Sequence, residues 1–145
     1  MLTPGDPAPA FSGTDHTGKP VSLNDYRGKN LVLWFFPKAD TPGCTAEGCG
    51  FRDHRAAFQE KNAEILGVSF DTAEENAAFV KKFDFNFPLL CDTSRAVGVA
   101  YGAADDASAK NAKRIGVIVG ADGKVRHWFP KVDARAFPEE ALKLL

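Results

Sequence analysis

Two uninterrupted hydrophobic runs dominate the pattern of the chain, at residues 30–36 and 63–70. Both are rich in β-branched and aromatic residues, which is typical of strands buried on both faces of a sheet. Two other segments, 11–23 and 114–129, carry short apolar pieces separated by turn residues, and each of them predicts a β-hairpin. The pattern therefore predicts a sheet with fully buried central strands, an N-terminal hairpin and a second hairpin late in the chain.

Helical patterns lie between these strands. Residues 71–83 begin with a capping-box sequence at Thr72 and continue with apolar residues at helical intervals. A short helical segment ends at Gly102, a last helix covers residues 133–145, and residues 87–92 form a short predicted strand. Strands that alternate with helices, together with the hairpins, predict an α/β fold of the thioredoxin-like type, with a central mixed β-sheet flanked by helices.

Length and charge narrow the class of protein. The 145 residues suit a single domain spanning residues 1–145, large enough to bury a hydrophobic core. The 18 basic and 19 acidic residues nearly cancel, and the basic run at residues 110–114 is short, so no nucleic-acid partner is expected. The amino terminus lacks a signal-peptide pattern and no stretch reaches the length of a membrane span. We therefore expect a cytoplasmic protein without a membrane partner.

Two of the three cysteines, Cys44 and Cys49, are five positions apart. Thr41 and Pro42 have the character of the N-cap and first position of a helix, which places Cys44 in the first turn after a buried strand. Unsatisfied backbone N–H groups and the helix dipole stabilise a thiolate there. The alternative is a buried free cysteine that acts only as a small hydrophobe. The strand-to-helix loop, where α/β folds place their chemistry, favours a reactive Cys44.

Cys49 is too far along the predicted helix to bond directly to Cys44. Five residues on an ideal helix place the two Cα atoms roughly 8.7 Å apart, whereas a disulfide tolerates at most about 7 Å. Gly48 and Gly50 each weaken a helix interior by about 1 kcal/mol relative to alanine. We therefore expect the first turns of this helix to unwind when the two sulfurs pair. Close packing against a neighbouring element is the alternative explanation for the two glycines.

The segment "PKADTPGC", residues 37–44, resembles the active-site pattern of the peroxiredoxins. The overlapping "CTAEGCGFRD" is similar to the Q-type peroxiredoxins, also called bacterioferritin comigratory proteins, in the atypical subgroup whose resolving cysteine lies five residues downstream. The segments "PGDPAPAF", "LVLWFFPK", "GVSFD" and "AYG", and the strand that begins near Arg114, occur in the order of that family. The resemblance therefore extends over the length of the chain.

The resemblance assigns a role to each matching residue. It implies that Cys44 is the peroxidatic cysteine and Cys49 the resolving cysteine. It also implies that Thr41 hydrogen-bonds the thiolate and the peroxide, that Pro37 shields the site from water, and that Arg114 supports the thiolate and the incoming peroxide oxygen.

One departure from the family pattern concerns the arginine. Ile115 and two further apolar residues follow Arg114, where family members carry hydroxyl residues and a phenylalanine, and Arg126 is a second arginine nearby in sequence. Glu47 matches a glutamate that often follows the family's cysteine, and a structural role would account for it. Arg114 remains the expected active-site arginine.

The implied reaction is the thiol-dependent reduction of hydrogen peroxide and organic hydroperoxides to water or alcohols. The departing oxygen needs hydrogen-bond donors, and the candidates are Arg114, the Thr41 hydroxyl and the N–H groups near Gly43 and Cys44. The sulfenic acid on Cys44 would condense with Cys49 to an intramolecular disulfide, which thioredoxin or a glutaredoxin-like dithiol donor would reduce. No metal or other cofactor is implied, and a monomer is expected because both cysteines belong to one chain.

Two other interpretations use the same cysteines. A thiol–disulfide oxidoreductase of the thioredoxin kind would share the fold, but its dithiol has two intervening residues and this chain has four. A zinc site would need Cys44, Cys49, His54 and a further ligand, and residues at five-residue steps point in different directions around a helix. Cys91 ends a predicted buried strand and is expected to pack as a hydrophobe, with an auxiliary resolving role as the alternative.

Overall fold

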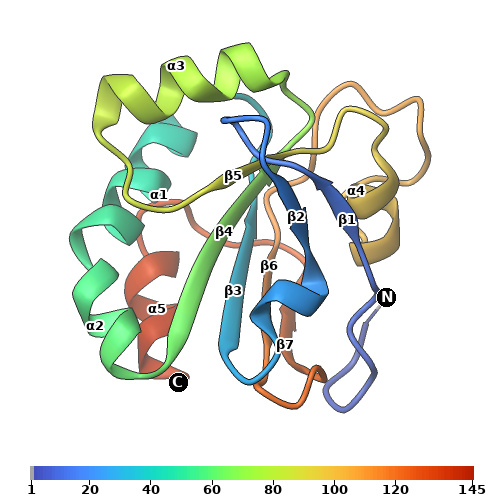
Figure 1. The fold of residues 1–145 in the computed structure, drawn as a ribbon, viewed down its shortest axis with the longest axis vertical. Coiled ribbons are helices and arrows are strands. Elements are labelled where there is room, and N and C mark those ends of the chain that lie inside the picture. The colour runs from blue at the N-terminus through green and yellow to red at the C-terminus, as the bar shows by residue number, and fades with distance from the viewer. Residues whose placement is uncertain (1) are drawn as a thin grey trace.

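The computed structural model describes residues 2–145 and contains a five-stranded mixed sheet with strand order β5-β4-β3-β6-β7 (Figure 1). The strands are β3 (Asn30–Phe35), β4 (Ala63–Ser69), β5 (Leu89–Cys91), β6 (Gly116–Val119) and β7 (Val125–Phe129). The first three run parallel to one another, and β6 is antiparallel to both β3 and β7. The mixed central sheet expected from the sequence is confirmed.

The central strand β3 explains the uninterrupted hydrophobic run. Leu31 and Leu33 belong to the core on one face of the sheet, whereas Val32 and Trp34 belong to the core on the other face. All four side chains are fully buried. A strand covered on both faces has no polar side, so its sequence shows no alternation.

Helices cover the two faces unequally. One face carries α1 (Pro42–Asp53), α2 (Arg55–Glu60), α3 (Ala73–Phe83) and α5 (Phe137–Lys143), as their buried aromatic residues show. The opposite face carries α4 (Ala96–Tyr101) and the hairpin of β1 (Ser12–Thr14) and β2 (Pro20–Ser22), with the 3-10 turn η1 (Leu23–Tyr26) following it (Figure 1). Both hairpins predicted from the sequence are therefore present.

The local signals in the sequence act as expected in most places. Thr72 and Glu75 form the capping box at the start of α3, and Gly102 ends α4 with a φ of 85°. Two elements were not predicted, η1 and α2. The helix α2 follows α1 directly, and His54 is both the C-cap of the first helix and the N-cap of the second.

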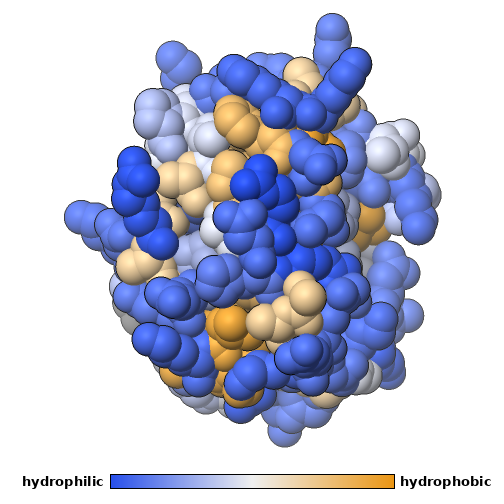
Figure 2. Space-filling view, turned by 90° about the vertical axis from the view of Figure 1, so that its left-hand side faces the viewer, coloured by the Kyte–Doolittle hydropathy of each residue, from blue (hydrophilic) through white to orange (hydrophobic). Residues whose placement is uncertain are grey.

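The face that carries α1, α2 and α5 is largely hydrophilic, with separate small hydrophobic areas (Figure 2). Among residues 2–145 the only large hydrophobic side chain classed as exposed is Val99, on α4. No helix in the same range combines the length and the apolar character needed to cross a membrane.

Candidate active site

The sheet topology brings the two halves of the candidate site together. The antiparallel pairing of β3 with β6 sets Trp34 opposite Gly116. The end of β3 and the beginning of β6 therefore lie at the same edge of the sheet. The loop that leads from β3 to α1 starts at this edge. Arg114 lies at the same edge, two residues before β6.

Cys44 lies in the first turn of α1 and is fully buried as a free thiol. Thr41 is the N-cap residue, with extended backbone angles, and Pro42 occupies the start of the helix, as the sequence predicted. The first N–H groups of a helix have no acceptor within it, so those of Gly43 and Cys44 are available to a ligand at the sulfur. This placement of Cys44 matches the expectation from the sequence.

Arg114 is the arginine that contacts the cysteine. Its Nη2 lies 3.4 Å from Sγ of Cys44, and its Nη1 donates to Oε1 of Glu47 at 2.8 Å. Arg126, the other candidate, is exposed at the second position of β7. A guanidinium at this distance stabilises negative charge on the sulfur.

Gly43 provides the space for this contact. A Cβ atom at position 43 would lie 2.9 Å from Nη2 of Arg114, which is too close for an unstrained contact. The glycine therefore allows the guanidinium to approach the first turn of α1 and reach Cys44.

Glu47 lies three residues after Cys44 and is fully buried. Burial raises the pKa of Glu47 to about 8, against the opposing effect of the hydrogen bond from Arg114. Its second oxygen, Oε2, has no hydrogen-bond partner within residues 2–145. The sequence indicated that Cys44 and Glu47 lie on the same face of the helix, because they are three residues apart. It did not show that Arg114 would contact both side chains.

The Thr41 side chain differs from the expected arrangement. Its hydroxyl donates to the carbonyl oxygen of Lys38 at 2.7 Å and makes no cap hydrogen bond to α1. With its proton directed at Lys38, the hydroxyl oxygen can only accept a hydrogen bond from a peroxide. Pro37, two residues after β3, is half-buried at the start of the same loop.

Cys49 is half-buried in the same unbroken helix as Cys44, and both thiols are free. The two flanking glycines have close neighbours. A Cβ at Gly48 would lie 2.4 Å from Cζ of Phe85, and a Cβ at Gly50 would lie 2.8 Å from Cγ of Pro138. These contacts support the packing explanation for the glycines, so the glycines alone no longer argue for unwinding.

Cys91 is buried at the end of β5, as expected for a packed thiol. Its sulfur also accepts a hydrogen bond from Nδ2 of Asn76 at 3.4 Å. Burial raises the pKa of the Cys91 thiol. A thiol that resists ionisation is a poor nucleophile, which disfavours the auxiliary resolving role.

The zinc interpretation gains no support from the geometry. Within residues 2–145 no three His, Cys, Asp or Glu side chains come together in a group that could hold a metal ion. His54, the third ligand in that interpretation, is the C-cap of α1, at the opposite end of the helix from Cys44.

Known proteins are similar to this chain in fold and in sequence. Residues 4–128 match the AhpC/TSA family. Peroxiredoxin Bcp of Escherichia coli (strain K12) is 37% identical over 133 residues, 88% of this chain and 85% of that protein. The crystal structure of peroxidoxin BcpB from Mycobacterium tuberculosis has a TM-score of 0.90 at 32% identity, covering 99% of this chain and 96% of that chain. The bacterioferritin comigratory protein of Xanthomonas campestris has a TM-score of 0.86 at 27% identity, covering 92% and 88% of the two chains.

The chain therefore belongs to the AhpC/TSA family and has the thioredoxin-like fold of that family. Its relatives are peroxiredoxins of the Bcp and Q type, which confirms the resemblance found in the sequence. The protein is accordingly a thiol peroxidase, and this class accounts for the fold and the five-residue cysteine spacing better than a thioredoxin-like oxidoreductase.

Proposed function

We propose that Cys44 is the peroxidatic cysteine and reduces hydrogen peroxide and organic hydroperoxides. The thiolate attacks one peroxide oxygen, an S–O bond forms and the O–O bond breaks. Cys44 becomes a sulfenic acid, and the departing oxygen takes up a proton and leaves as water or an alcohol. The observation that carries the proposal is the 3.4 Å contact between Arg114 and the sulfur of a first-turn cysteine. Alkyl peroxide reduction by the Xanthomonas campestris relative supports the organic substrates.

The donors around the sulfur would stabilise the charge that develops on the oxygens. In this proposal Arg114 and the N–H groups of Gly43 and Cys44 donate to the peroxide oxygens, and the Thr41 hydroxyl accepts from the peroxide O–H. Such preorganised donors usually supply the largest part of catalysis at a site of this kind. Pro37, next to this loop, would limit access of water to the sulfur.

Cys49 is proposed as the resolving cysteine. It would condense with the Cys44 sulfenic acid, forming an S–S bond and releasing water. Both thiols are free in a continuous α1, and the expected Cα separation exceeds the span of a disulfide. The start of α1 must therefore open between the two chemical steps.

The remaining steps follow from a disulfide within one chain. We propose that thioredoxin or a glutaredoxin-like dithiol protein reduces it through a mixed disulfide, which regenerates both thiols. A monomer would suffice for this cycle. The cytoplasmic location predicted from the sequence fits a protein that needs a dithiol reductant.

Three serine variants test the cysteine assignments. Cys44→Ser should abolish peroxide turnover, and Cys49→Ser should complete one oxidation and accumulate the sulfenic acid. Cys91→Ser is the matched control and should cycle normally, because the serine oxygen can still accept from Asn76. Peptide mass mapping after one equivalent of peroxide would identify the sulfurs that pair. Full thioredoxin-dependent cycling by Cys49→Ser would falsify the resolving role.

A further inference from the structure

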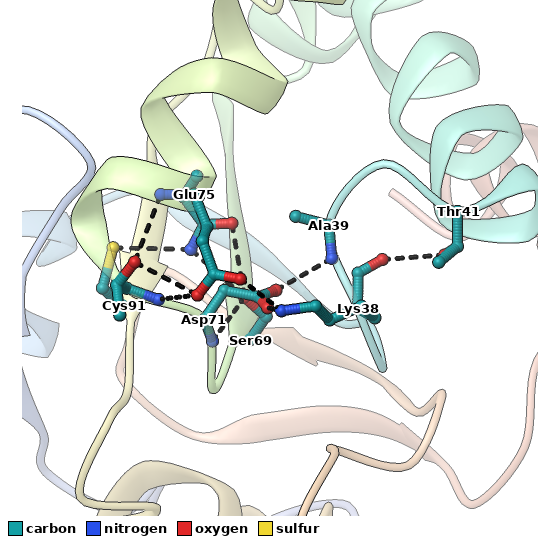
Figure 3. A network of polar contacts seen from close by, with 9 residues as sticks. Lys38, Ala39, Thr41, Ser69, Asp71, Glu75 and Cys91 are labelled. Carbon is teal, nitrogen blue, oxygen red and sulfur yellow. Dashed lines mark hydrogen bonds and ion pairs between the residues drawn. The ribbon is translucent and has the colours of Figure 1, made fainter.

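The segment 37–41, which forms most of the loop that joins β3 to α1, carries Pro37 and Thr41 and leads directly to Cys44. It belongs to neither element, so its position depends on contacts with the rest of the protein. Figure 3 shows these contacts gathered around the carboxylate of Asp71, which lies two residues after the end of β4. Asp71 makes no hydrogen bond to the sulfur of Cys44 or to Arg114; its partners are Lys38, Ala39 and Ser69.

Asp71 holds the loop at two points. Its Oδ2 accepts from the N–H of Ala39 at 2.8 Å, and its Oδ1 accepts from Nζ of Lys38 at 2.6 Å. The Asp71 side chain is only 3% exposed. Hydrogen bonds to a charged group shielded from water are stronger than those at the surface, and a buried carboxylate that loses a partner is costly.

Lys38 extends the contact across the loop and to α3. Its Nζ also bonds to the carboxylate of Glu75, which belongs to the capping box of α3. The carbonyl oxygen of Lys38 accepts a hydrogen bond from the hydroxyl of Thr41, the N-cap residue of α1. Asp71 is thereby connected, through one lysine, to the N-cap of the helix that carries Cys44.

Asp71 is in turn fixed by buried groups behind it. Its N–H donates to Oγ of Ser69 at 3.3 Å, and Nδ2 of Asn76 donates to the same oxygen at 3.1 Å. The Asn76 amide also reaches Cys91, and Asn76 is fully buried. Because these residues belong to β4, α3 and β5, Asp71 is attached to the framework and serves as the fixed end of its contacts with the loop (Figure 3).

We propose that Asp71 is a positioning residue for the peroxidase reaction, which fixes the 37–41 loop and the start of α1 through Ala39 and Lys38. The proposal rests on the proposed function, because it takes Cys44 as the reacting thiol. The fixed loop aligns Thr41 and the first-turn N–H groups around the sulfur, which the attack on peroxide requires. Disulfide formation has the opposite requirement, because α1 must open at its start. A weaker contact at Asp71 should therefore slow the first step and accelerate the second.

Asp71→Asn tests this expectation with little change in shape. The amide oxygen can still accept from Ala39, but the charge that pairs with Lys38 is lost. A hydrogen bond to a charged group contributes enough that its loss should lower the rate constant of Cys44 oxidation by hydrogen peroxide roughly tenfold. Disulfide formation should become faster, and less Cys44 should be over-oxidised in excess peroxide. Rapid-mixing tryptophan fluorescence and intact-protein mass spectrometry measure these quantities.

Asp40→Asn is the matched control, with the same chemical change in the same loop. Asp40 pairs with Nζ of Lys82 at 2.9 Å, and the two side chains are 46% and 59% exposed. Exposed pairs of this kind contribute little to structure. The control should therefore keep wild-type rates in both steps. Lys38→Met removes the ion pair with the buried Asp71 carboxylate by changing its exposed partner, the lysine, which is 46% exposed. It should reproduce the opposite changes in the two rates even if Asp71→Asn folds poorly.

The two steps separate a positioning role from general damage to the fold. Opposite changes in the two rates, in Asp71→Asn or in a folded Lys38→Met, would support the proposal. Unchanged rates, or equal slowing of both steps, in Lys38→Met would overturn it. Loss of turnover in Cys44→Ser with wild-type behaviour of Lys38→Met would reject the role of Asp71 alone. Retained turnover in Cys44→Ser would instead reject the proposed function.

Discussion

The carboxyl group of Glu47 and the sulfur of Cys44 share one guanidinium. Nη1 of Arg114 donates to Oε1 of Glu47 at 2.8 Å, while Nη2 lies 3.4 Å from Sγ of Cys44. Burial raises the pKa of Glu47 to about 8, which favours the protonated carboxyl in the folded protein. A protonated Glu47 leaves the charge of Arg114 for the sulfur. The electrostatics of the proposed reaction therefore depend on a carboxyl group that makes no direct contact with the sulfur.

The first prediction concerns Arg114. Arg114→Gln should lower the rate constant of Cys44 oxidation by on the order of a hundredfold, because it removes a charged donor from the developing oxyanion. Arg126→Gln changes an exposed arginine on β7 and is the matched control, with an expected wild-type rate. Rapid-mixing kinetics with hydrogen peroxide measure both variants. Similar losses in the two variants would show that the contact between Arg114 and Cys44 has no special role.

The second prediction concerns the pH dependence of stability. The folded state raises the pKa of Glu47 from 4.5 to about 8. Between these two pH values, Glu47 therefore holds a proton in the folded state that it has released in the unfolded state. The contribution of Glu47 to the free energy of unfolding is therefore fully present below 4.5 and is lost as the pH rises through about 8. Glu47→Gln cannot ionise and should lose less stability over this range.

Urea unfolding of the wild type and Glu47→Gln at several pH values tests this sign. The glutamine keeps an oxygen that can accept a hydrogen bond from Arg114, so the difference in free energy of unfolding between the two proteins reports the ionisation of Glu47. As the pH rises, the free energy of unfolding of Glu47→Gln should increase relative to that of the wild type. A constant difference across the range would mean that Glu47 has the same protonation in both states.

The third prediction concerns Gly43. Gly43→Ala would place a Cβ 2.9 Å from Nη2 of Arg114, and the end of a flexible side chain can move away at low cost. The variant should therefore oxidise roughly tenfold more slowly, from loss of one charge-assisted contact. Its free energy of unfolding should not fall, because alanine is favoured over glycine in helices by about 1 kcal/mol. A normal oxidation rate would show that Arg114 can reach Cys44 by another path.

The fold was predictable from the sequence where the signals are local or where burial is complete. The hydrophobic runs of β3 and β4 and the capping box at Thr72 depend on short segments, and all three predictions are confirmed. The helix α2 was missed because only six residues separate His54 from its end, too few for a clear helical period.

Local sequence signals predicted the site only as far as the residues near Cys44, whereas Arg114 was expected from the family resemblance alone. The first-turn position of the cysteine follows from Thr41 and Pro42, which are its neighbours in sequence. The contact of Arg114 with both Cys44 and Glu47 joins segments far apart in the chain, through the pairing of β3 with β6. Such contacts depend on tertiary packing, which no spacing along the chain records.

The last prediction separates the two explanations for Gly48, which differ in sign. If the glycine serves only to weaken the helix, Gly48→Ala should stabilise the folded protein by about 1 kcal/mol. The Cβ would instead lie 2.4 Å from Cζ of Phe85, and that ring stacks at 5.2 Å on Phe87 and meets Phe79 at 4.8 Å. A ring held on both sides cannot move freely. Overpacking of this kind costs about 1–3 kcal/mol, so we expect Gly48→Ala to lower the free energy of unfolding.

Phe85→Leu, combined with Gly48→Ala in one protein, should recover part of the loss, which a double-mutant cycle by urea unfolding would measure. A stabilised Gly48→Ala would restore the helix-weakening role, and with it the use of this glycine as evidence that α1 opens.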